Sequence, residues 1–506
     1  MDPAWQDDAP LWKAWVAARH RLEAGDLRPF TVPGHKQRAD LVGDIVSGDL
    51  PLYGGLAAIR DADALLRDAE ERAAARLGAD WCRYSVGGST HANQAPALAV
   101  GAPGDSVLVD RTCHRSVLLG LVLAGLRPVW LHPPIDAATG LPLGMAAATV
   151  AEALTAHPET RAVFVTSPSY VGTCADIAEI SRVTRDAEVP LVVDAAWGAH
   201  LGSHPDLPPH PFAAGADVVV TSAHKTLPAL NQGALVLART RASGGLLDAD
   251  RLDRAIEATA TTSPSGAVLA SVDGALALLA AQGGDLAGAL LGRVRSAREV
   301  LRRVPGLVLP DASSFPTAAD GSARFDDAKL VVLTAGTGAD GIAVDRDLAA
   351  VGYTLEMADR DLLIPMVTLA DHDDSVADLA GALADTVEQR RATPRAVATN
   401  AAWTVAADQA MTPREAFFAP REPVPWALAP GRICAEVVAP YPPGVPVLAP
   451  GERMTRAALD ALREARAAGA RIAYAADPTL ATVLAVRDEV PVDVPVDVPV
   501  DVGAGP

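Results

Sequence analysis

Residues 215–233, GADVVVTSAHKTLPALNQG, decide the fold. They begin with a valine run that ends in small and polar residues, which is typical of a buried strand. Similar runs are SVLVD (106–110), AVFVTS (162–167) and PLVVDAA (190–196), with helix-like segments between them. This alternation predicts an α/β protein with a mostly parallel sheet and crossover helices.

The overall composition excludes several classes of protein. A formal charge of −19 argues against a nucleic-acid partner, because such binding depends on Lys and Arg. No two of the four cysteines have CxxC spacing, which argues against zinc and disulfides and predicts a cytoplasmic location. The apolar stretch 268–291 contains Asp273, Gln282 and Asp285, so we expect a buried helix and no membrane span.

Lys225 and Asp194 are the first candidates for chemistry. Lys225 follows the strand at 216–222, so its amine would lie at the carboxyl end of that strand, where open α/β sheets bind ligands. There it could form an imine with a carbonyl cofactor. Asp194 ends a very apolar strand, and a protonated pyridine nitrogen would be a suitable partner for its carboxylate. The alternatives are a solvated loop lysine and an aspartate that caps the next helix.

The segment 85–100, SVGGSTHANQAPALAV, predicts a phosphate site. Gly87, Gly88, Ser89 and Thr90 precede a helix-like run, whose free N–H groups could receive a phosphate, although a simple capped turn has the same pattern. Further candidates are Ser222 and His224, which flank Lys225, and His114, which could stack on an aromatic ring or be an ordinary core histidine.

Eight motifs extend this picture along the chain. They are TVPGHK (31–36), GGSTHAN (87–93), CHRS (113–116), TSPSYVG (166–172), VDAAWGAH (193–200), the stretch 215–233, TTSPS (261–265) and YPPGVPVLAPGE (441–452). In this order they resemble the Orn/Lys/Arg decarboxylase family of fold type I pyridoxal-phosphate enzymes, with an aspartate aminotransferase-like large domain. The resemblance covers roughly residues 28–485.

The resemblance implies roles for individual residues. Lys225 would hold pyridoxal 5'-phosphate as a Schiff base, Asp194 would pair with the pyridine nitrogen, and His114 would stack on the ring. The phosphate would be held by Gly88, Ser89, Thr90, Ser222 and His224. The family also implies a homodimer with a shared active site, in which Thr262 of TTSPS could reach a neighbour's phosphate. The length resembles the short family members that lack a wing domain.

Two segments depart from the family pattern. After its core strand the family commonly has DEAH, whereas this chain has Asp194, Ala195, Ala196 and Trp197. The family's His would lie near the phenolic oxygen of the cofactor, so Trp197 must stack or fill space there. The second departure is at 49–66, DLPLYGGLAAIRDADALL, where the family often has a Thr-Glu pair.

The function that we expect is decarboxylation of an amino acid. The resemblance implies lysine, ornithine or arginine as substrate and a precursor of polyamine metabolism, together with CO2, as products. Either Lys225 or His224 would protonate Cα. The alternatives are transamination, an aldol-type cleavage, or a regulatory protein that binds the cofactor without catalysis. Glu436 and Tyr441 are candidate pocket residues, although a Pro-rich turn with a solvated Glu explains them equally well.

The length of 506 residues predicts more than one domain. The expected units are an N-terminal dimerisation arm (1–45), a large cofactor-binding domain (46–285), a small α+β domain (286–395), a C-terminal decarboxylase-like domain (396–487) and a disordered VPVD-repeat tail (488–506). Within the large domain, residues 61–78 have first-turn acids, helical spacing of apolar residues and a final Gly, which predict a helix.

Overall fold

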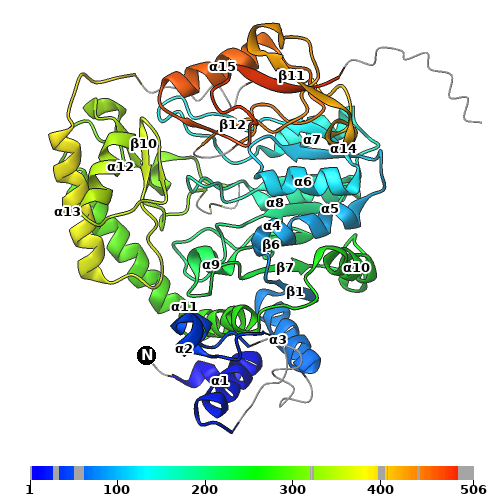
Figure 1. The fold of residues 1–506 in the computed structure, drawn as a ribbon, viewed down its shortest axis with the longest axis vertical. Coiled ribbons are helices and arrows are strands. Elements are labelled where there is room, and N and C mark those ends of the chain that lie inside the picture. The colour runs from blue at the N-terminus through cyan, green and yellow to red at the C-terminus, as the bar shows by residue number, and fades with distance from the viewer. Residues whose placement is uncertain are drawn as a thin grey trace, which may run out of the picture.

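A computed structural model of the chain describes residues 3–26, 33–50, 62–318, 321, 324–396, 405–406, 408–441 and 445–487. The repeat tail, the start of TVPGHK, most of the departing segment 49–66 and part of YPPGVPVLAPGE lie outside these ranges. In Figure 1 the central sheet has the small α+β region (green to yellow) on one side. The C-terminal region (orange to red) covers its upper end, and α1 and α3 lie below.

A seven-stranded sheet organises the large region, with strand order β1-β7-β6-β5-β4-β2-β3. Its strands are β1 (Trp81–Ser85), β2 (Ser106–Asp110), β3 (Arg127–Leu131), β4 (Val163–Thr166), β5 (Leu191–Asp194), β6 (Val218–Thr221) and β7 (Ala234–Ala238). Strands β3, β2, β4, β5 and β6 are parallel, while β7 is antiparallel to both of its neighbours. The mostly parallel sheet and its four predicted strands are confirmed.

Helices cover both faces of this sheet, as the crossover connections require. They are α3 (Ala62–Leu77), α4 (Gly88–Ala92), α5 (Gln94–Val100), α6 (Arg115–Ala124), α7 (Ala147–Ala156), α8 (Ile177–Asp186), α9 (Ala223–Thr226), α10 (Ala249–Thr259) and α11 (Gly266–Leu301). Alternate residues of β6 enter two different apolar clusters, since Val219 belongs to one and Val218 and Val220 to the other. Both faces are therefore buried, which explains the continuous valine run.

Helix α11 is 36 residues long and includes the apolar stretch 268–291. By length and composition it could span a membrane, but more than half of its most apolar window is buried inside the protein. The completely buried Asp273 accepts hydrogen bonds from the backbone N–H groups of Leu11 (2.9 Å) and Trp12 (3.2 Å) in α1 (Pro10–Glu23). The buried helix was therefore predicted correctly. The proposed domain boundary at 285/286 falls inside it.

A smaller region follows α11. It contains a sheet with strand order β8-β10-β9, and its elements are β8 (Val332–Leu333), α12 (Gly341–Ala350), β9 (Met357–Ala358), β10 (Leu362–Ile364) and α13 (Asp373–Gln389). Short helices elsewhere are α2 (Ala39–Val42) and the 3-10 turns at Pro3–Asp8, Asp44–Val46, Arg241–Ser243, Ala312–Ser314, Ala335–Thr337 and Trp426–Leu428.

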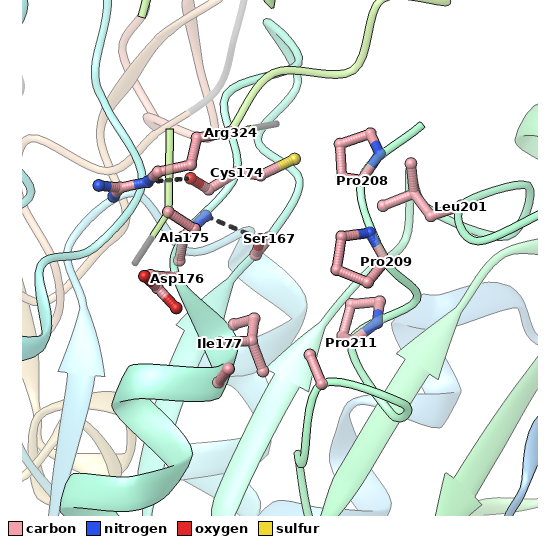
Figure 2. Close-up of a pocket in the computed structure, with 13 residues that line it drawn as sticks. Ser167, Cys174, Ala175, Asp176, Ile177, Leu201, Pro208, Pro209, Pro211 and Arg324 are labelled. Atoms are coloured by element: carbon pink, nitrogen blue, oxygen red, sulfur yellow. Dashed lines mark hydrogen bonds between the residues drawn. The ribbon is translucent and has the colours of Figure 1, made fainter. Parts of the chain in front are cut away.

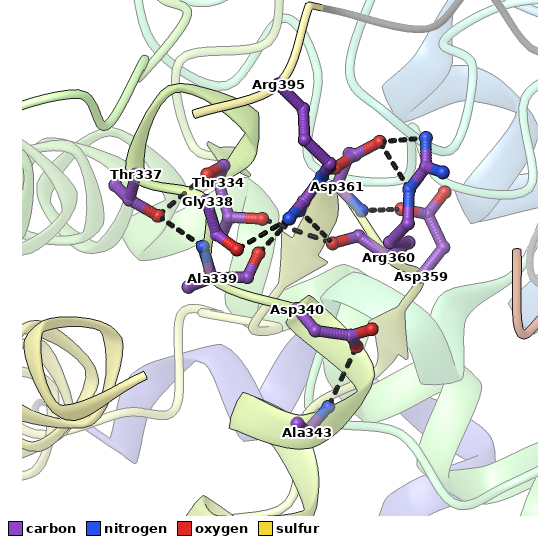
Figure 3. Close-up of polar contacts among 10 residues, drawn as sticks. All are labelled: Thr334, Thr337, Gly338, Ala339, Asp340, Ala343, Asp359, Arg360, Asp361 and Arg395. Carbon is purple, nitrogen blue, oxygen red and sulfur yellow. Dashed lines mark hydrogen bonds and ion pairs between the residues drawn. The ribbon is translucent and has the colours of Figure 1, made fainter. Parts of the chain in front are cut away.

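Arg395 holds the β9–β10 hairpin in place (Figure 3). Its guanidinium donates to Asp361 Oδ1 (2.7 Å) and to the carbonyl oxygens of Gly338 (2.5 Å) and Ala339 (2.7 Å). Charge-assisted bonds of this kind are among the stronger hydrogen bonds in proteins. Glu356 directly precedes β9, so the network also positions the backbone that carries this carboxylate.

The C-terminal region contains two small antiparallel sheets. Its elements are α14 (Pro413–Phe418), β11 (Arg421–Pro425), β12 (Ala439–Tyr441), α15 (Arg456–Ala467), β13 (Arg471–Ala473) and β14 (Thr482–Val486). A buried ion pair connects it to the central sheet. Arg111, directly after β2, binds both carboxylate oxygens of Glu452 and the carbonyl oxygen of Val447 (2.8 Å).

Candidate active site

The predicted chemical residues meet at one edge of the central sheet. His114 follows β2, Asp194 ends β5, Lys225 follows β6, and Gly88 follows β1. Strand β1 is antiparallel to β7, which is antiparallel to β6, so β1 runs in the same direction as the parallel strands. All four carboxyl ends therefore lie at the edge where open α/β sheets bind ligands.

A chain of hydrogen bonds connects Asp194 to His114. Asn93 donates through Nδ2 to Asp194 Oδ2 (2.8 Å) and to Ser116 Oγ (2.9 Å), and that hydroxyl lies 2.9 Å from His114 Nδ1. The backbone N–H of Ala196 donates to Asp194 Oδ1 (3.1 Å). Ser116 N–H also donates to His114 Nδ1, so this nitrogen is an acceptor and Nε2 carries the proton of a neutral ring. The carboxylate and the imidazole are thus both fixed in orientation.

Lys225 lies against Trp197, with Nζ 3.9 Å from the centroid of the indole ring. Burial lowers the pKa of the Lys225 amine, while the negative charges of Asp194 and Glu356 oppose this shift. A lower pKa increases the fraction of free amine near neutral pH, and only the free amine can attack a carbonyl carbon. The environment therefore suits an imine-forming lysine.

His224, the neighbour of Lys225, has a defined tautomer. Its Nδ1 lies 2.9 Å from the carbonyl oxygen of Gly233, and because a carbonyl only accepts, Nδ1 must carry the proton. Burial lowers the pKa of His224, with a smaller contribution in the same direction from the positive charge of Lys225. The neutral ring is favoured, and its Nε2 is then an acceptor.

The residues around the first helix turns fit a phosphate. Gly88 has φ +67°, a left-handed conformation that favours glycine. Its N–H donates to the carbonyl oxygen of Gln232 (2.8 Å). In the part of the chain that the structure describes, the buried Oγ of Ser222 has no hydrogen-bond partner. A buried hydroxyl without a partner is costly, and a phosphate oxygen would satisfy it. Of the remaining predicted contacts, Ser89 is buried, whereas Thr90 and Thr262 are exposed.

Glu436 and Tyr441 have structural partners in the C-terminal region. The two carboxylate oxygens of Glu436 accept hydrogen bonds from the backbone N–H groups of Leu484 (2.7 Å) and Ala476 (2.6 Å). The ring of Tyr441 lies 4.9 Å from the guanidinium carbon of Arg471. These contacts support a role for Glu436 in stabilising the C-terminal fold, and its role as a pocket residue stays a prediction.

The sequence interpretation missed four residues that contribute to the site. Asn93 and Ser116 lie within the recognised motifs GGSTHAN and CHRS but were given no role. Lys329 Nζ lies 4.0 Å from the same Trp197 centroid as Lys225, and Glu356 influences the pKa of both lysines. The scarcity of lysine, with only four in the chain, was the one signal that pointed to Lys329.

A small cavity elsewhere takes no part in this arrangement (Figure 2). It lies between the end of β4, the start of α8 and the prolines of residues 208–211. Ser167 Oγ accepts from the N–H of Ala175 (3.0 Å), and Arg324 Nε donates to the carbonyl oxygen of Cys174 (3.4 Å). Burial raises the pKa of the Cys174 thiol, which disfavours the thiolate form that reacts. None of the predicted chemical residues lines this cavity.

Comparisons with known proteins agree with the geometry. The chain matches the Orn/Lys/Arg decarboxylase major domain over residues 30–320 and the C-terminal domain of the same family over residues 396–472. It is 32% identical to an arginine decarboxylase of Halalkalibacterium halodurans, over 96% of this chain and 98% of that protein. It is 30% identical to an arginine decarboxylase of Bacillus subtilis, over 91% and 95% of the two chains.

Solved structures show the same fold. Lysine decarboxylase A from Pseudomonas aeruginosa superposes with a TM-score of 0.76 at 22% identity, over 94% of this chain and 80% of that one. An alanine–glyoxylate aminotransferase from Nostoc sp. gives a TM-score of 0.50 at 18% identity, over 64% and 86% of the two chains. The fold is therefore that of the fold type I enzymes, which use pyridoxal 5'-phosphate. The chain belongs to the Orn/Lys/Arg decarboxylase family and is a pyridoxal-phosphate-dependent amino acid decarboxylase.

Proposed function

We propose that the protein decarboxylates a basic amino acid, with arginine as the preferred substrate, and releases CO2 and a di- or polyamine precursor. The observation that carries the proposal is the position of Glu356, an exposed carboxylate whose charge acts on Lys225, His224 and Lys329. An accessible negative charge beside the reacting lysine would attract the cationic end of a basic side chain. The relatives named arginine decarboxylase support arginine.

The proposed cofactor contacts follow from the positions of the side chains in the site. Lys225 would bind the carbonyl carbon, and Asp194 would accept the proton of the pyridine nitrogen while Asn93 and Ala196 hold its carboxylate. His114 would lie on the ring face, fixed by Ser116. When bound there, pyridoxal 5'-phosphate would supply an electron-withdrawing ring for the reaction at Cα. The phosphate contacts would be Ser89, Thr90, Ser222 and His224, beside the turn that Gly88 makes.

The tautomer of His224 supports Lys225, and not His224, as the proton donor to Cα. The Nδ1 proton of His224 is engaged by Gly233, and the unprotonated Nε2 of a neutral ring has no proton to donate. The lowered pKa of His224 makes the doubly protonated ring less populated still. Lys225 is the next residue in the chain and carries exchangeable protons when charged. We therefore assign the acid role to Lys225 and a phosphate-side role to His224.

A CO2-release assay with added pyridoxal phosphate tests the proposed function. We expect release from arginine and much less from lysine or ornithine, with none in Lys225→Ala. Citrulline has nearly the shape of arginine but no charge on its side chain. Comparing the two substrates therefore isolates the effect of the Glu356 charge. We expect Glu356→Gln to reduce the preference for arginine over citrulline about 10- to 100-fold, since hydrogen bonds to charged groups contribute about 1.5–3 kcal/mol.

Two outcomes would contradict this proposal. Release from a nonbasic amino acid alone would exclude a basic substrate. An unchanged preference in Glu356→Gln would remove Glu356 from the side-chain pocket even if arginine is the substrate. Visible absorption of the added cofactor, which depends on Lys225, serves as the control that each variant still binds it.

We further propose a homodimer in the cytoplasm. An exposed Thr262 in TTSPS would be accessible to a neighbouring subunit's phosphate, and all four cysteines are buried free thiols, as expected in a reducing compartment. Sedimentation of the purified protein should give twice the chain mass of 52.1 kDa. A chain that is fully active at the monomer mass would contradict the shared active site.

A further inference from the structure

Two lysines contact one indole ring in the active site. The Nζ atoms of Lys225 and Lys329 lie 3.9 and 4.0 Å from the centroid of Trp197, so they can be no further apart than about 8 Å. The two residues come from different regions, since Lys225 follows β6 of the central sheet and Lys329 precedes β8 of the small sheet. The fold therefore brings together two of only four lysines in the chain.

Lys329 is an unusually poorly solvated cation. Lys329 is 4% exposed, and its Nζ contacts, besides the indole, the thioether sulfur of Met366 at 3.7 Å, a weak acceptor. Among the described residues, no carboxylate lies within ion-pair distance of Nζ. The nearby Asp326 is instead paired with His200, whose Nε2 lies 3.1 Å from Asp326 Oδ2. The positive charge of Lys329 therefore has no direct ionic partner among the described residues.

The charged groups around the pair have opposing effects. Burial, together with the charge of Lys225, lowers the pKa of Lys329 to about 8, against the opposing charges of Asp326 and Glu356. Burial also lowers the pKa of Lys225, against Asp194 and Glu356. His114 and His224 face Lys225 as well, and its positive charge contributes to the lowered pKa of each ring. Charge on either lysine thus disfavours charge on the other.

We propose that Lys225 and Lys329 titrate as a coupled pair, in which Lys329 is a positioning residue that keeps part of Lys225 as a free amine near neutral pH. The inference rests on the proposed role of Lys225 as the cofactor lysine. The step that Lys329 assists is deprotonation of Lys225. The Lys225 ammonium releases one proton to solvent, and the positive charge that remains on Lys329 makes that release easier. Like charges held in one desolvated pocket lose their protons in two separate steps.

Labelling of the lysine amines measures this coupling directly in the full-length protein freed of cofactor. Acylation follows the unprotonated fraction, so the pH profile of Lys225 labelling, read by mass spectrometry of peptides, gives its midpoint. The exposed Lys13 is an internal reference in the same digest. In Lys329→Met we expect the Lys225 midpoint to rise by about one pH unit, because a like charge is removed.

Lys329→Arg is the matched control, because it keeps a positive charge at all accessible pH values. We expect its Lys225 midpoint to remain at or below that of the wild type. The proposal is overturned if Lys329→Met leaves the midpoint unchanged. It is also overturned if Arg raises the midpoint as much as Met, since shape and not charge would then be responsible. Circular dichroism checks that both variants are folded.

Cofactor capture supplies an independent reading. With added pyridoxal phosphate at pH 7, the visible absorption band should appear about tenfold more slowly in Lys329→Met, and the difference should vanish at high pH. If Lys225→Ala still acquires the band, the proposed function fails while the labelling result stands. If Lys225→Ala loses it but the Met variant captures cofactor at the wild-type rate, only the coupling fails.

Discussion

Arg111 and Lys329 are both buried cations that lie on the face of a tryptophan, but their counterions differ. The guanidinium carbon of Arg111 lies 4.7 Å from the Trp130 centroid, and its two terminal nitrogens reach Glu452. Lys329 lies 4.0 Å from the Trp197 centroid and has no carboxylate within ion-pair distance among the described residues. One cation has its charge compensated by a direct partner, and the other does not.

This difference separates a structural charge from a functional one. Arg111 connects β2 to the C-terminal region, so its pairing stabilises the arrangement of two regions. Lys329 lies beside the lysine that we assign to the cofactor, where an uncompensated charge can shift a neighbour's pKa. Buried charges that are fully paired resist titration, whereas those left partly unpaired respond to pH and to ligands.

The largest effect is expected from breaking the Arg111–Glu452 pair. Arg111→Met leaves the carboxylate of Glu452 buried without its cation, and losing one partner of such a pair typically costs about 3–5 kcal/mol. The free energy of unfolding, from urea denaturation followed by tryptophan fluorescence, should fall by this amount. In the double variant Arg111→Met/Glu452→Met we expect most of the loss to be recovered, because no buried charge remains. A single variant as stable as the wild type would show that water reaches the carboxylate.

The next effect concerns two aspartates at strand ends. Asp110 ends β2 and Asp194 ends β5, and both are buried. Asp110 accepts from the N–H groups of Thr112 (2.8 Å) and Thr166 (3.3 Å), so its role is to stabilise the ends of β2 and β4. We expect Asp194→Asn to reduce kcat about 10²- to 10³-fold, the usual cost of losing one electrostatic contact to the reacting group. Asp110→Asn, measured beside it, should lower the melting temperature and should reduce kcat much less than Asp194→Asn does. Equal losses of kcat would contradict the assignment of Asp194.

The sequence predicted the sheet side of the site well and the opposite side poorly. His114, Asp194 and Lys225 follow strand-like runs, so their position at one edge follows from the parallel order of the strands. Lys329 and Glu356 come from the small region, and nothing local in the sequence shows that these segments fold over Trp197. The structural contacts of Glu436 could not be predicted either, because its backbone partners, Ala476 and Leu484, are distant in sequence.

A smaller effect is expected at Glu70, a buried carboxylate that is only loosely paired. Arg83 lies 3.6 Å away, the N–H of Tyr84 donates to Oε1 (2.9 Å), and burial raises the pKa of Glu70 to about 7. Below pH 4.5 the folded and unfolded states both hold this proton. Between 4.5 and 7 only the unfolded state releases it, so stability falls as pH rises, by at most about 1.4 kcal/mol per pH unit.

Glu70→Gln keeps an acceptor for Tyr84 and removes the titration. We therefore expect the variant to gain stability relative to the wild type as pH rises from 5 to 7, and to keep that gain above pH 7. Urea unfolding at four pH values measures the difference. A difference that does not change with pH would show that Glu70 ionises in the folded protein as it does in the unfolded chain.

The smallest change in stability, which is also opposite in sign to that of Arg111→Met, is expected for Lys329→Met. Lysine has an unshifted pKa of 10.5, which burial lowers to about 8 in the folded protein. Between these values the unfolded chain holds a proton that the folded chain has released, so stability rises with pH, and below 8 the full cost is present. Methionine removes that cost, and we expect a gain on the order of 1 kcal/mol at pH 7 that shrinks toward pH 10. A loss at pH 7 as large as that of Arg111→Met would mean that Lys329 has a counterion after all, and the distinction between the two cations would disappear.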